Sequence, residues 1–318
     1  MAALFTIDST FVPLIVAYFF LYIYLRFPPT NFVHPFSQNI SPELNKYRYW
    51  DTSPFNSSEV LAPLVNFYEN YRIAPEYNLA TCQIQKSLST LRAGIFCVLY
   101  DTPGFLEQNL SISELDWYTM SCGNKNEYFN IEAVHQQLKP NFGNFAVVRD
   151  PVDRFISGFV DKCVNEADRG FCYGCNKDLH CFTITQYNRF KAYTMGQLGE
   201  EKMGFEDIHF APQTWYCRFN EYFSSYRFIR YENGQRIAKM SDSLQQILEE
   251  NGVEEPLRKI IEKETLKGRT YHTTHGSSIR QQYENELYNS PDLLQLISKM
   301  FYFDFIMFDY PFPKLHNA

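Results

Sequence analysis

One short segment of the chain gathers a lysine and three hydroxyl side chains: Lys86, Ser87, Ser89 and Thr90. The alternating run at 80–85 predicts a strand before them, and the amphipathic run at 91–101 predicts a helix after them. Where a strand leads through a loop into a helix, unpaired backbone N–H groups and the helix dipole favour an anion at the same place. The segment therefore predicts an anion site that carries its own cation. The same residues also fit a simple helix cap beside a solvated lysine.

A second segment places an arginine at the end of a predicted strand. The run NFAVV at 144–148 predicts a short buried strand, Arg149 follows it, and Pro151 suits the first turn of a helix. On that helix Arg154 and Ser157 share a face, because they are three positions apart. Arginine can hold a phosphate through two N–H groups at once. The alternative is helix capping by a nearby aspartate, with the arginines at the surface.

The elements that position these residues follow from the same patterns. Both predicted strands are followed by helices, and three further segments predict surface helices, at 241–250, 255–266 and 291–300. Strands that alternate with helices predict an α/β fold with a central parallel sheet flanked by helices. We find no internal repeat or low-complexity tract, and we expect one domain over 71–318.

The charge composition limits the class of ligand. The chain has 318 residues, with 29 basic and 36 acidic side chains, so its formal net charge is -7. This balance argues against binding of nucleic acid through its phosphates. Even residues 139–162 carry four basic side chains against three acidic ones. An anionic ligand must therefore be held by directed hydrogen bonds, and a short or lightly charged acceptor is favoured over a highly sulfated polymer.

The N-terminal region has the pattern of a membrane anchor. Residues 11–25 are uncharged and apolar on every face, and a polar, proline-containing stretch follows them. We predict a cytoplasmic tail at 1–10, an uncleaved transmembrane signal anchor at 11–27 and a stalk at 28–70. The basic residues after the anchor would place the rest of the chain in the cytoplasm by the positive-inside rule, so its orientation needs other evidence.

The eight cysteines bear on the compartment. Four of them crowd into one stretch: Cys163, Cys172, Cys175 and Cys181. A disulfide-tied loop and a zinc site both fit this stretch. Zinc usually takes two close pairs of ligands, and only the middle two cysteines have that spacing, so we favour disulfides and an oxidising lumen. Three glycosylation sequons are about as many as chance would give, and they do not decide the compartment.

Together, the two anion segments resemble a known enzyme family. ATCQIQKSLSTL at 80–91 looks like the 5'-phosphosulfate loop of Golgi carbohydrate sulfotransferases, and VVRDPVDRFISGFVDK at 147–162 looks like their 3'-phosphate element. HFAPQTWYC at 209–217 and the C-terminal block ending FYFDFIMFDYP resemble the chondroitin, dermatan and HNK-1 branch. The CYGC loop resembles nematode members. The resemblance covers about 71–313, but the lysine loop departs from the vertebrate pattern, with glutamine in place of the usual proline before the lysine.

The resemblance implies transfer of a sulfuryl group from 3'-phosphoadenosine 5'-phosphosulfate to a glycan hydroxyl group, with a chondroitin-like chain among the expected acceptors. It assigns donor binding to six residues: Lys86, Ser87, Ser89, Thr90, Arg149 and Ser157. In this assignment Lys86 also neutralises the charge that builds up on the oxygen between the 5'-phosphate and the sulfuryl group, so that no metal is required. The family orientation implies a single-pass type II protein of the Golgi membrane with a luminal catalytic domain.

A histidine is the natural base for the acceptor hydroxyl group near neutral pH. We choose His209, because it lies in a block that resembles the family. His272 and His275 are rivals, and His135 is a weaker one. Two further functions stay open. One is a luminal glycan-binding pseudoenzyme with the same fold, and the other is a P-loop kinase, against which the missing glycines of a GxxxxGK[ST] loop count.

Overall fold

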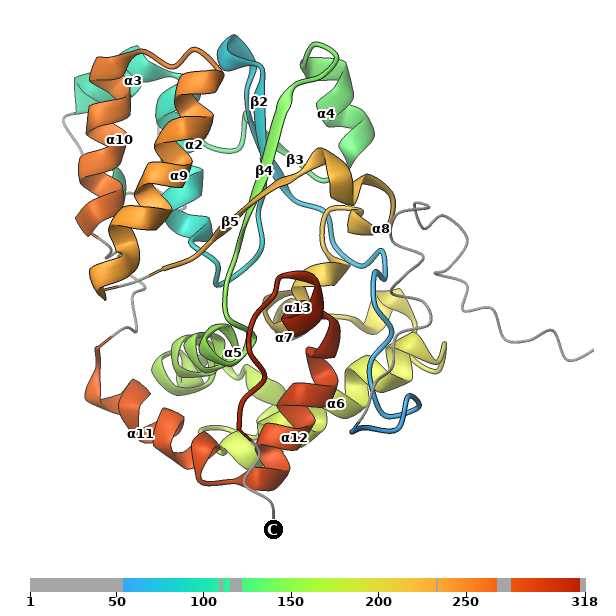
Figure 1. The fold of residues 1–318 in the computed structure, drawn as a ribbon. Helices are drawn as coiled ribbons and strands as arrows, with labels where there is room; N and C mark the ends of the chain where they lie inside the picture. Colours follow the sequence, from blue (N-terminus) through green and yellow to red (C-terminus); the bar gives the residue numbers. More distant parts are fainter. Residues whose placement is uncertain (1–53, 109–110, 115–121, 233, 268–275, 315–318) are drawn as a thin grey trace, which may run out of the picture. The chain divides into compact units, whose positions relative to one another are not determined.

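The computed structural model describes residues 54–108, 111–114, 122–232, 234–267 and 276–314 (Figure 1). The predicted cytoplasmic tail, signal anchor and most of the stalk lie outside these residues, and those predictions stay predictions. None of the helices within the described ranges is long and apolar enough to cross a membrane.

A five-stranded sheet lies at the centre of the described part of the chain, in the order β3-β1-β2-β4-β5 (Figure 1). Its strands are β1 (Tyr71–Ala74), β2 (Leu79–Cys82), β3 (Glu127–Tyr128), β4 (Gly143–Val148) and β5 (Arg227–Arg230). β2 is parallel to β4, as the sequence predicts for two strands that lead into helices, and β5, which the sequence did not predict, is parallel to β4. β1 is antiparallel to β2 and to β3, so the sheet is mixed and the prediction of a parallel sheet was wrong at this edge.

The short link between β1 and β2 explains the antiparallel edge. Pro75–Tyr77 forms a single 3-10 turn, and Asn78 takes a left-handed conformation with a φ of 48°. A parallel pair would need a crossover of about a dozen residues or more. The chain therefore folds straight back, and Tyr71 pairs with Cys82.

The helices surround this sheet. The α-helices of the described residues are α2 (Ser89–Tyr100), α3 (Thr102–Gln108), α4 (Ile131–Gln137), α5 (Pro151–Phe159), α6 (Leu179–Thr194), α7 (Phe205–Phe210), α8 (Phe219–Tyr222), α9 (Ile237–Glu250), α10 (Glu255–Lys267), α11 (Ser278–Tyr288), α12 (Pro291–Met300) and α13 (Tyr302–Met307). The three surface helices expected from the sequence are confirmed as α9, α10 and α12. A π-helix, η5 (Val160–Asn165), continues α5, and a 3-10 helix, η9 (Gln213–Trp215), precedes α8.

The helices form two groups, one beside the sheet and one beyond the end of β4 (Figure 1). α2, α9 and α10 lie together beside it, and their buried core includes Phe96, Phe145 and Leu248. α5, α6, α11 and α12 gather beyond the end at which β4 runs into α5. Leu61 and Leu64, within the predicted stalk, are buried, and the Leu61 N–H donates to the Lys299 carbonyl at 3.2 Å, so this part of the stalk packs with the domain.

Candidate active site

The loop between β2 and α2 has the geometry of an anion-binding turn. Lys86 and Leu88 have φ of 64° and 65°, a left-handed conformation that costs a residue with a side chain about 1–3 kcal/mol. α2 begins at Ser89, and none of the described side chains caps it. The first N–H groups of a helix have no intrahelical acceptor, and here they lie together with the positive end of the helix dipole. The simple helix cap that the sequence also allowed is not found.

The three predicted hydroxyl groups lie in this turn. The buried Ser87 hydroxyl donates to the Gln213 Oε1 atom at 3.3 Å, so it ties the loop to the start of η9. The Ser89 hydroxyl donates to the Gln85 Oε1 atom at 3.4 Å, and Thr90 is half-buried on the first turn of α2. Ser89 and Thr90 are therefore placed at the open helix end, whereas Ser87 mainly supports the loop.

Lys86 forms a largely buried ion pair that no local pattern in the sequence predicts. Its Nζ atom lies 2.9 Å from the Asp161 Oδ2 atom, and the Lys162 Nζ atom lies 3.0 Å from the same oxygen. Burial lowers the pKa of Lys86, and Asp161 offsets part of that shift. Burial alone would raise the pKa of Asp161, but the two lysines outweigh it and the pKa is lowered. Asp161 therefore keeps a charged Lys86 in a nearly dry site.

Arg149 lies at the carboxyl end of β4 beside this loop. Its Nη1 atom donates to the Lys86 carbonyl at 2.8 Å, and its Nε atom donates to Asp153 at 2.5 Å. The guanidinium also lies over the ring of Tyr231, 4.4 Å from its centroid. Burial opposes the charge, but Asp153, Tyr231 and Asp150 together outweigh it and the pKa of Arg149 is raised. Ser157 is buried on the second turn of α5.

Arg280 is a second buried arginine at this point, and sequence reasoning missed it. It comes from α11 and pairs with the other oxygen of Asp153. Only 4% of Arg280 is exposed, and its Nη1 atom has no hydrogen-bond partner among the described residues. A buried N–H group without a partner is costly, so this atom points to an absent acceptor.

Two buried side chains join the loops into one site. Gln213 accepts from the Arg149 N–H and donates to its carbonyl, both at 2.8 Å, and it also accepts from Ser87. Arg154 donates to the Gln85 carbonyl at 2.9 Å and to the His209 carbonyl at 3.3 Å. A disulfide between Cys82 and Cys217 closes the same arrangement, because these cysteines flank the β2 loop and the segment that carries Gln213.

His209 is the one predicted histidine that the described residues bring to the lysine loop. It lies on α7, and its Nδ1 atom is 2.7 Å from the Phe205 carbonyl, which leaves Nε2 for another partner. Burial, together with the charges of Lys86 and Lys162, lowers the pKa of His209 to about 3. His209 is therefore neutral at neutral pH, as a general base must be.

The other histidines do not share this position. His135 lies on α4, where its ring is 5.2 Å from that of Phe142, just before β4 begins. Arg149 lies at the opposite end of that strand. His272 and His275 lie outside the described residues.

The cysteines of the described residues pair as disulfides, which confirms that prediction. The pairs are Cys82–Cys217, Cys97–Cys122, Cys163–Cys172 and Cys175–Cys181. Across the described ranges, no group of histidine, cysteine, aspartate and glutamate side chains is placed to hold a metal ion.

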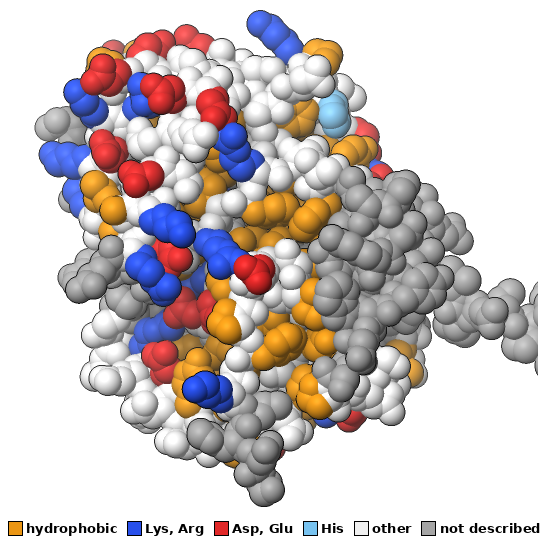
Figure 2. Space-filling model, in the orientation of Figure 1, with side chains coloured by type: hydrophobic (Ala, Val, Ile, Leu, Met, Phe, Trp, Pro, Cys, Tyr) orange, Lys and Arg blue, Asp and Glu red, His pale blue; other side chains and the backbone are white. Residues whose placement is uncertain are grey.

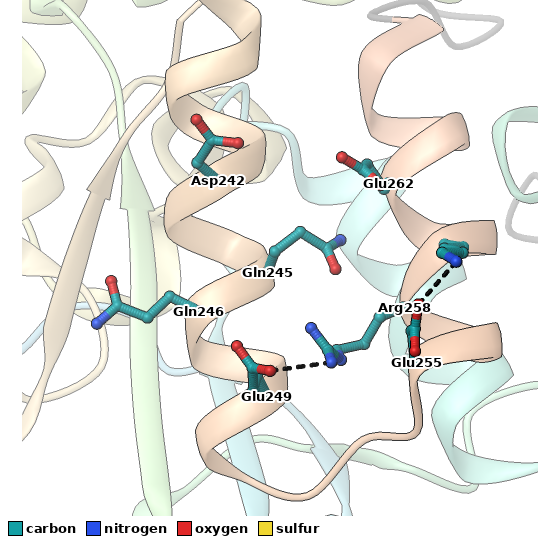
Figure 3. Close-up of a pocket in the computed structure, with 8 residues that line it drawn as sticks. Asp242, Gln245, Gln246, Glu249, Glu255, Arg258 and Glu262 are labelled. Atoms are coloured by element: carbon teal, nitrogen blue, oxygen red, sulfur yellow. Dashed lines mark hydrogen bonds and ion pairs between the residues drawn. The ribbon is translucent and has the colours of Figure 1, made fainter.

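The distribution of charged side chains on the surface favours recognition of an anion at one site rather than over a broad basic surface. On the face in Figure 2, basic side chains lie next to acidic ones and form no continuous basic surface. A pocket between α9 and α10 contains none of the predicted site residues. Figure 3 shows Arg258 reaching toward Glu249 across this pocket, at 3.1 Å, and Lys259 pairs with Glu255 at 2.7 Å. Four acidic side chains line this pocket against two basic ones, so it does not suit an anion. The predicted site residues gather instead at the carboxyl ends of the neighbouring strands β2 and β4.

The loops that follow β2 and β4 can hold an anionic ligand at two points. One is the open end of α2 with Lys86, and the other is the Arg149 and Arg280 pair, which Asp153 holds together. A neutral histidine lies close to the first point. Such a site suits a nucleotide with acidic groups at two positions and transfer of a group to a hydroxyl acceptor.

Comparisons with known proteins identify the family of the chain. A family model described as the sulfotransferase family matches residues 69–311. Carbohydrate sulfotransferase chst-1 of Caenorhabditis elegans is 33% identical over 289 residues, which cover 88% of this chain and 87% of that protein. Putative sulfotransferase vep-2 of the same organism is 30% identical over 260 residues, covering 79% and 77%. No solved structure matches.

Proposed function

The chain belongs to the sulfotransferase family, and on this premise we propose that it transfers a sulfuryl group from 3'-phosphoadenosine 5'-phosphosulfate to a hydroxyl group of a glycan. The observation that carries the proposal is the pair of adjacent anion sites at the carboxyl ends of β2 and β4. The Arg149 guanidinium donates to the Lys86 carbonyl at 2.8 Å, so the two sites are directly linked. One nucleoside with acidic groups at its 5' and 3' positions would fill both.

The residues present fit this donor. When bound, the donor supplies an activated sulfuryl group and a good leaving group. The amides at the start of α2, with Ser87, Ser89 and Thr90 around them, would hold the 5' end. Arg149, Ser157 and Arg280 would hold the 3'-phosphate, and the unpartnered Nη1 atom of Arg280 would gain its acceptor.

Lys86 supplies the positive charge where negative charge develops on the bridging oxygen. In the resting protein this charge is already paired with Asp161 at 2.9 Å. Asp161 is shared with Lys162, so it keeps one cation when Lys86 turns toward the donor. A positive charge in a site with little water stabilises developing negative charge more strongly than it would in bulk water.

His209 would accept the proton of the acceptor hydroxyl group through Nε2. Its Nδ1 atom is held by the Phe205 carbonyl, which fixes the ring. Burial holds its pKa at about 3 without donor. An anionic donor beside Lys86 would offset the lysine charges and raise that pKa, so His209 becomes a stronger base only when the donor is present.

We also propose a luminal Golgi location, with a single-pass type II anchor at 11–27 and a stalk that ends at about Leu61, where the chain packs with the domain. The four disulfides support an oxidising compartment, because such bonds are rare in the cytosol. A chondroitin-like chain is one acceptor to test.

Binding of the desulfated donor tests the site. We expect 3'-phosphoadenosine 5'-phosphate to raise the melting temperature of the protein, and Lys86→Ala and Arg149→Ala to remove both that shift and sulfate transfer. Lys259→Ala, on the exposed face of α10, is the matched control. Stabilisation by ATP with Mg²⁺ instead would favour a kinase, and nucleotide binding without transfer to any glycan would favour a pseudoenzyme.

A further inference from the structure

Two aromatic rings lie next to His209 at the rim of the proposed site. Phe171 and Phe205 stack with ring centroids 4.5 Å apart and an interplanar angle of 20°. The Phe205 ring is also 4.1 Å from the His209 ring. Phe205 is 38% exposed, whereas most large aromatic side chains near the site are buried. We call Phe171 and Phe205 the aromatic pair.

The aromatic pair is connected to Lys86 by a continuous chain of contacts. The Lys162 Nζ atom lies 5.4 Å from the Phe205 ring centroid and 3.0 Å from Asp161. Asp161 in turn lies 2.9 Å from Lys86. The half-buried Phe171 and the exposed Phe205 therefore border the place where the sulfuryl group would be transferred.

The scaffold holds the aromatic pair in place. The Cys163–Cys172 disulfide ties the loop that carries Phe171 to the π-helix that carries Asp161 and Lys162. The Cys172 N–H donates to Glu206 at 2.7 Å, which joins the same loop to α7 next to Phe205. A preformed surface loses less conformational entropy on binding than a mobile one.

The charges around the aromatic pair select against an anionic polymer. Residues 165–170 and 199–206 flank the two rings, and together they hold five carboxylates against two basic side chains. Lys162 is already paired with Asp161 and with Glu166. A polyanion would be repelled here, whereas an uncharged ring would not.

We propose that the aromatic pair is the acceptor subsite and that it binds the apolar face of an uncharged pyranose ring, with one hydroxyl group directed to His209. This assignment rests on the proposed function. A pyranose carries C–H groups on one face and hydroxyl groups at its edge. The C–H face packs against aromatic rings, and the edge stays available for hydrogen bonds and for reaction.

Steady-state kinetics of the full protein with Phe205→Ala tests the assignment. The probes are p-nitrophenyl glycosides of uncharged sugars and desulfated chondroitin. We expect Phe205→Ala to raise the KM for the uncharged acceptor about two- to tenfold, the range for one aromatic contact, and to leave the KM for the donor unchanged. Phe205→Tyr should retain the wild-type acceptor KM. Phe129→Ala removes a ring that is 58% exposed next to β3, at the far edge of the sheet, and it should have no effect.

The outcomes separate this inference from the proposed function. A wild-type protein that transfers sulfate, with an unchanged acceptor KM in Phe205→Ala, overturns the subsite alone. A preference for desulfated chondroitin over every uncharged glycoside overturns the uncharged acceptor. A wild-type protein that transfers sulfate to no probe overturns the proposed function and the subsite with it. Stabilisation of Phe205→Ala by 3'-phosphoadenosine 5'-phosphate shows that the variant is folded.

Discussion

The buried pair of Lys86 and Asp161 gives the sharpest energetic prediction. Their atoms are 2.9 Å apart, and their side chains are 12% and 6% exposed. At an effective dielectric constant of about 20, this distance corresponds to an attraction of about 6 kcal/mol. Lys162 lies 3.0 Å from the same oxygen and keeps Asp161 paired when Lys86 is removed. We therefore expect a coupling energy of about 3 kcal/mol, within the range that double-mutant cycles give for close charge pairs.

A double-mutant cycle of Lys86→Met and Asp161→Asn measures this coupling. Unfolding in urea can be followed by the fluorescence of Trp215, which is buried. The matched control is the Lys259 and Glu255 pair, which has a similar separation of 2.7 Å but side chains that are 70% and 65% exposed. We expect no measurable coupling in the control, because water screens an exposed pair. A coupling between Lys86 and Asp161 no larger than that of the control would refute the reasoning.

Three further predictions follow from the same site. The free energy of unfolding should fall by up to about 1.4 kcal/mol per pH unit as the pH drops from about 6.5, because the unfolded state protonates a histidine that the fold keeps neutral. In urea unfolding, His209→Gln should flatten this slope, and an unchanged slope would contradict the prediction. Arg280→Ala should weaken the affinity for 3'-phosphoadenosine 5'-phosphate, measured by calorimetry, about 10–100-fold and leave the affinity for adenosine 5'-phosphosulfate unchanged. An equal loss of affinity for both nucleotides would count against a contact with the 3'-phosphate. Replacing both Cys82 and Cys217 by alanine should lower the free energy of unfolding by about 4–5 kcal/mol, because their disulfide closes a loop of 135 residues. Removal of the Cys175–Cys181 disulfide, with a separation of 6, should cost less, and a larger cost there would contradict the loop argument.

Local patterns in the sequence predicted the two anion loops. The strand, turn and helix around Lys86 and those around Arg149 are each coded within about twenty residues, so periodicity and turn chemistry could identify them. The structure then links the two loops through Gln213, which had no local signal. The antiparallel pairing of β1 was missed, because the length of one link decides it.

The missed site residues share a physical cause. Asp161 lies inside the second motif, but the π-helix changes the register after α5, and helical spacing could not show that it meets Lys86. Arg280 reaches Asp153 across 127 positions of the sequence. Its only sequence signal is its place in the C-terminal block that resembles the family. Long-range pairs of this kind depend on the packing of α11 against α5, which no short pattern records.

Transfer of labelled sulfate is the most direct test of the central claim. The purified protein would be incubated with labelled 3'-phosphoadenosine 5'-phosphosulfate and a panel of desulfated glycosaminoglycans and simple glycans, with Lys86→Ala as the inactive control. We predict that the wild type labels at least one glycan and that Lys86→Ala labels none. Labelling by both proteins, or by neither across the whole panel, would contradict the account.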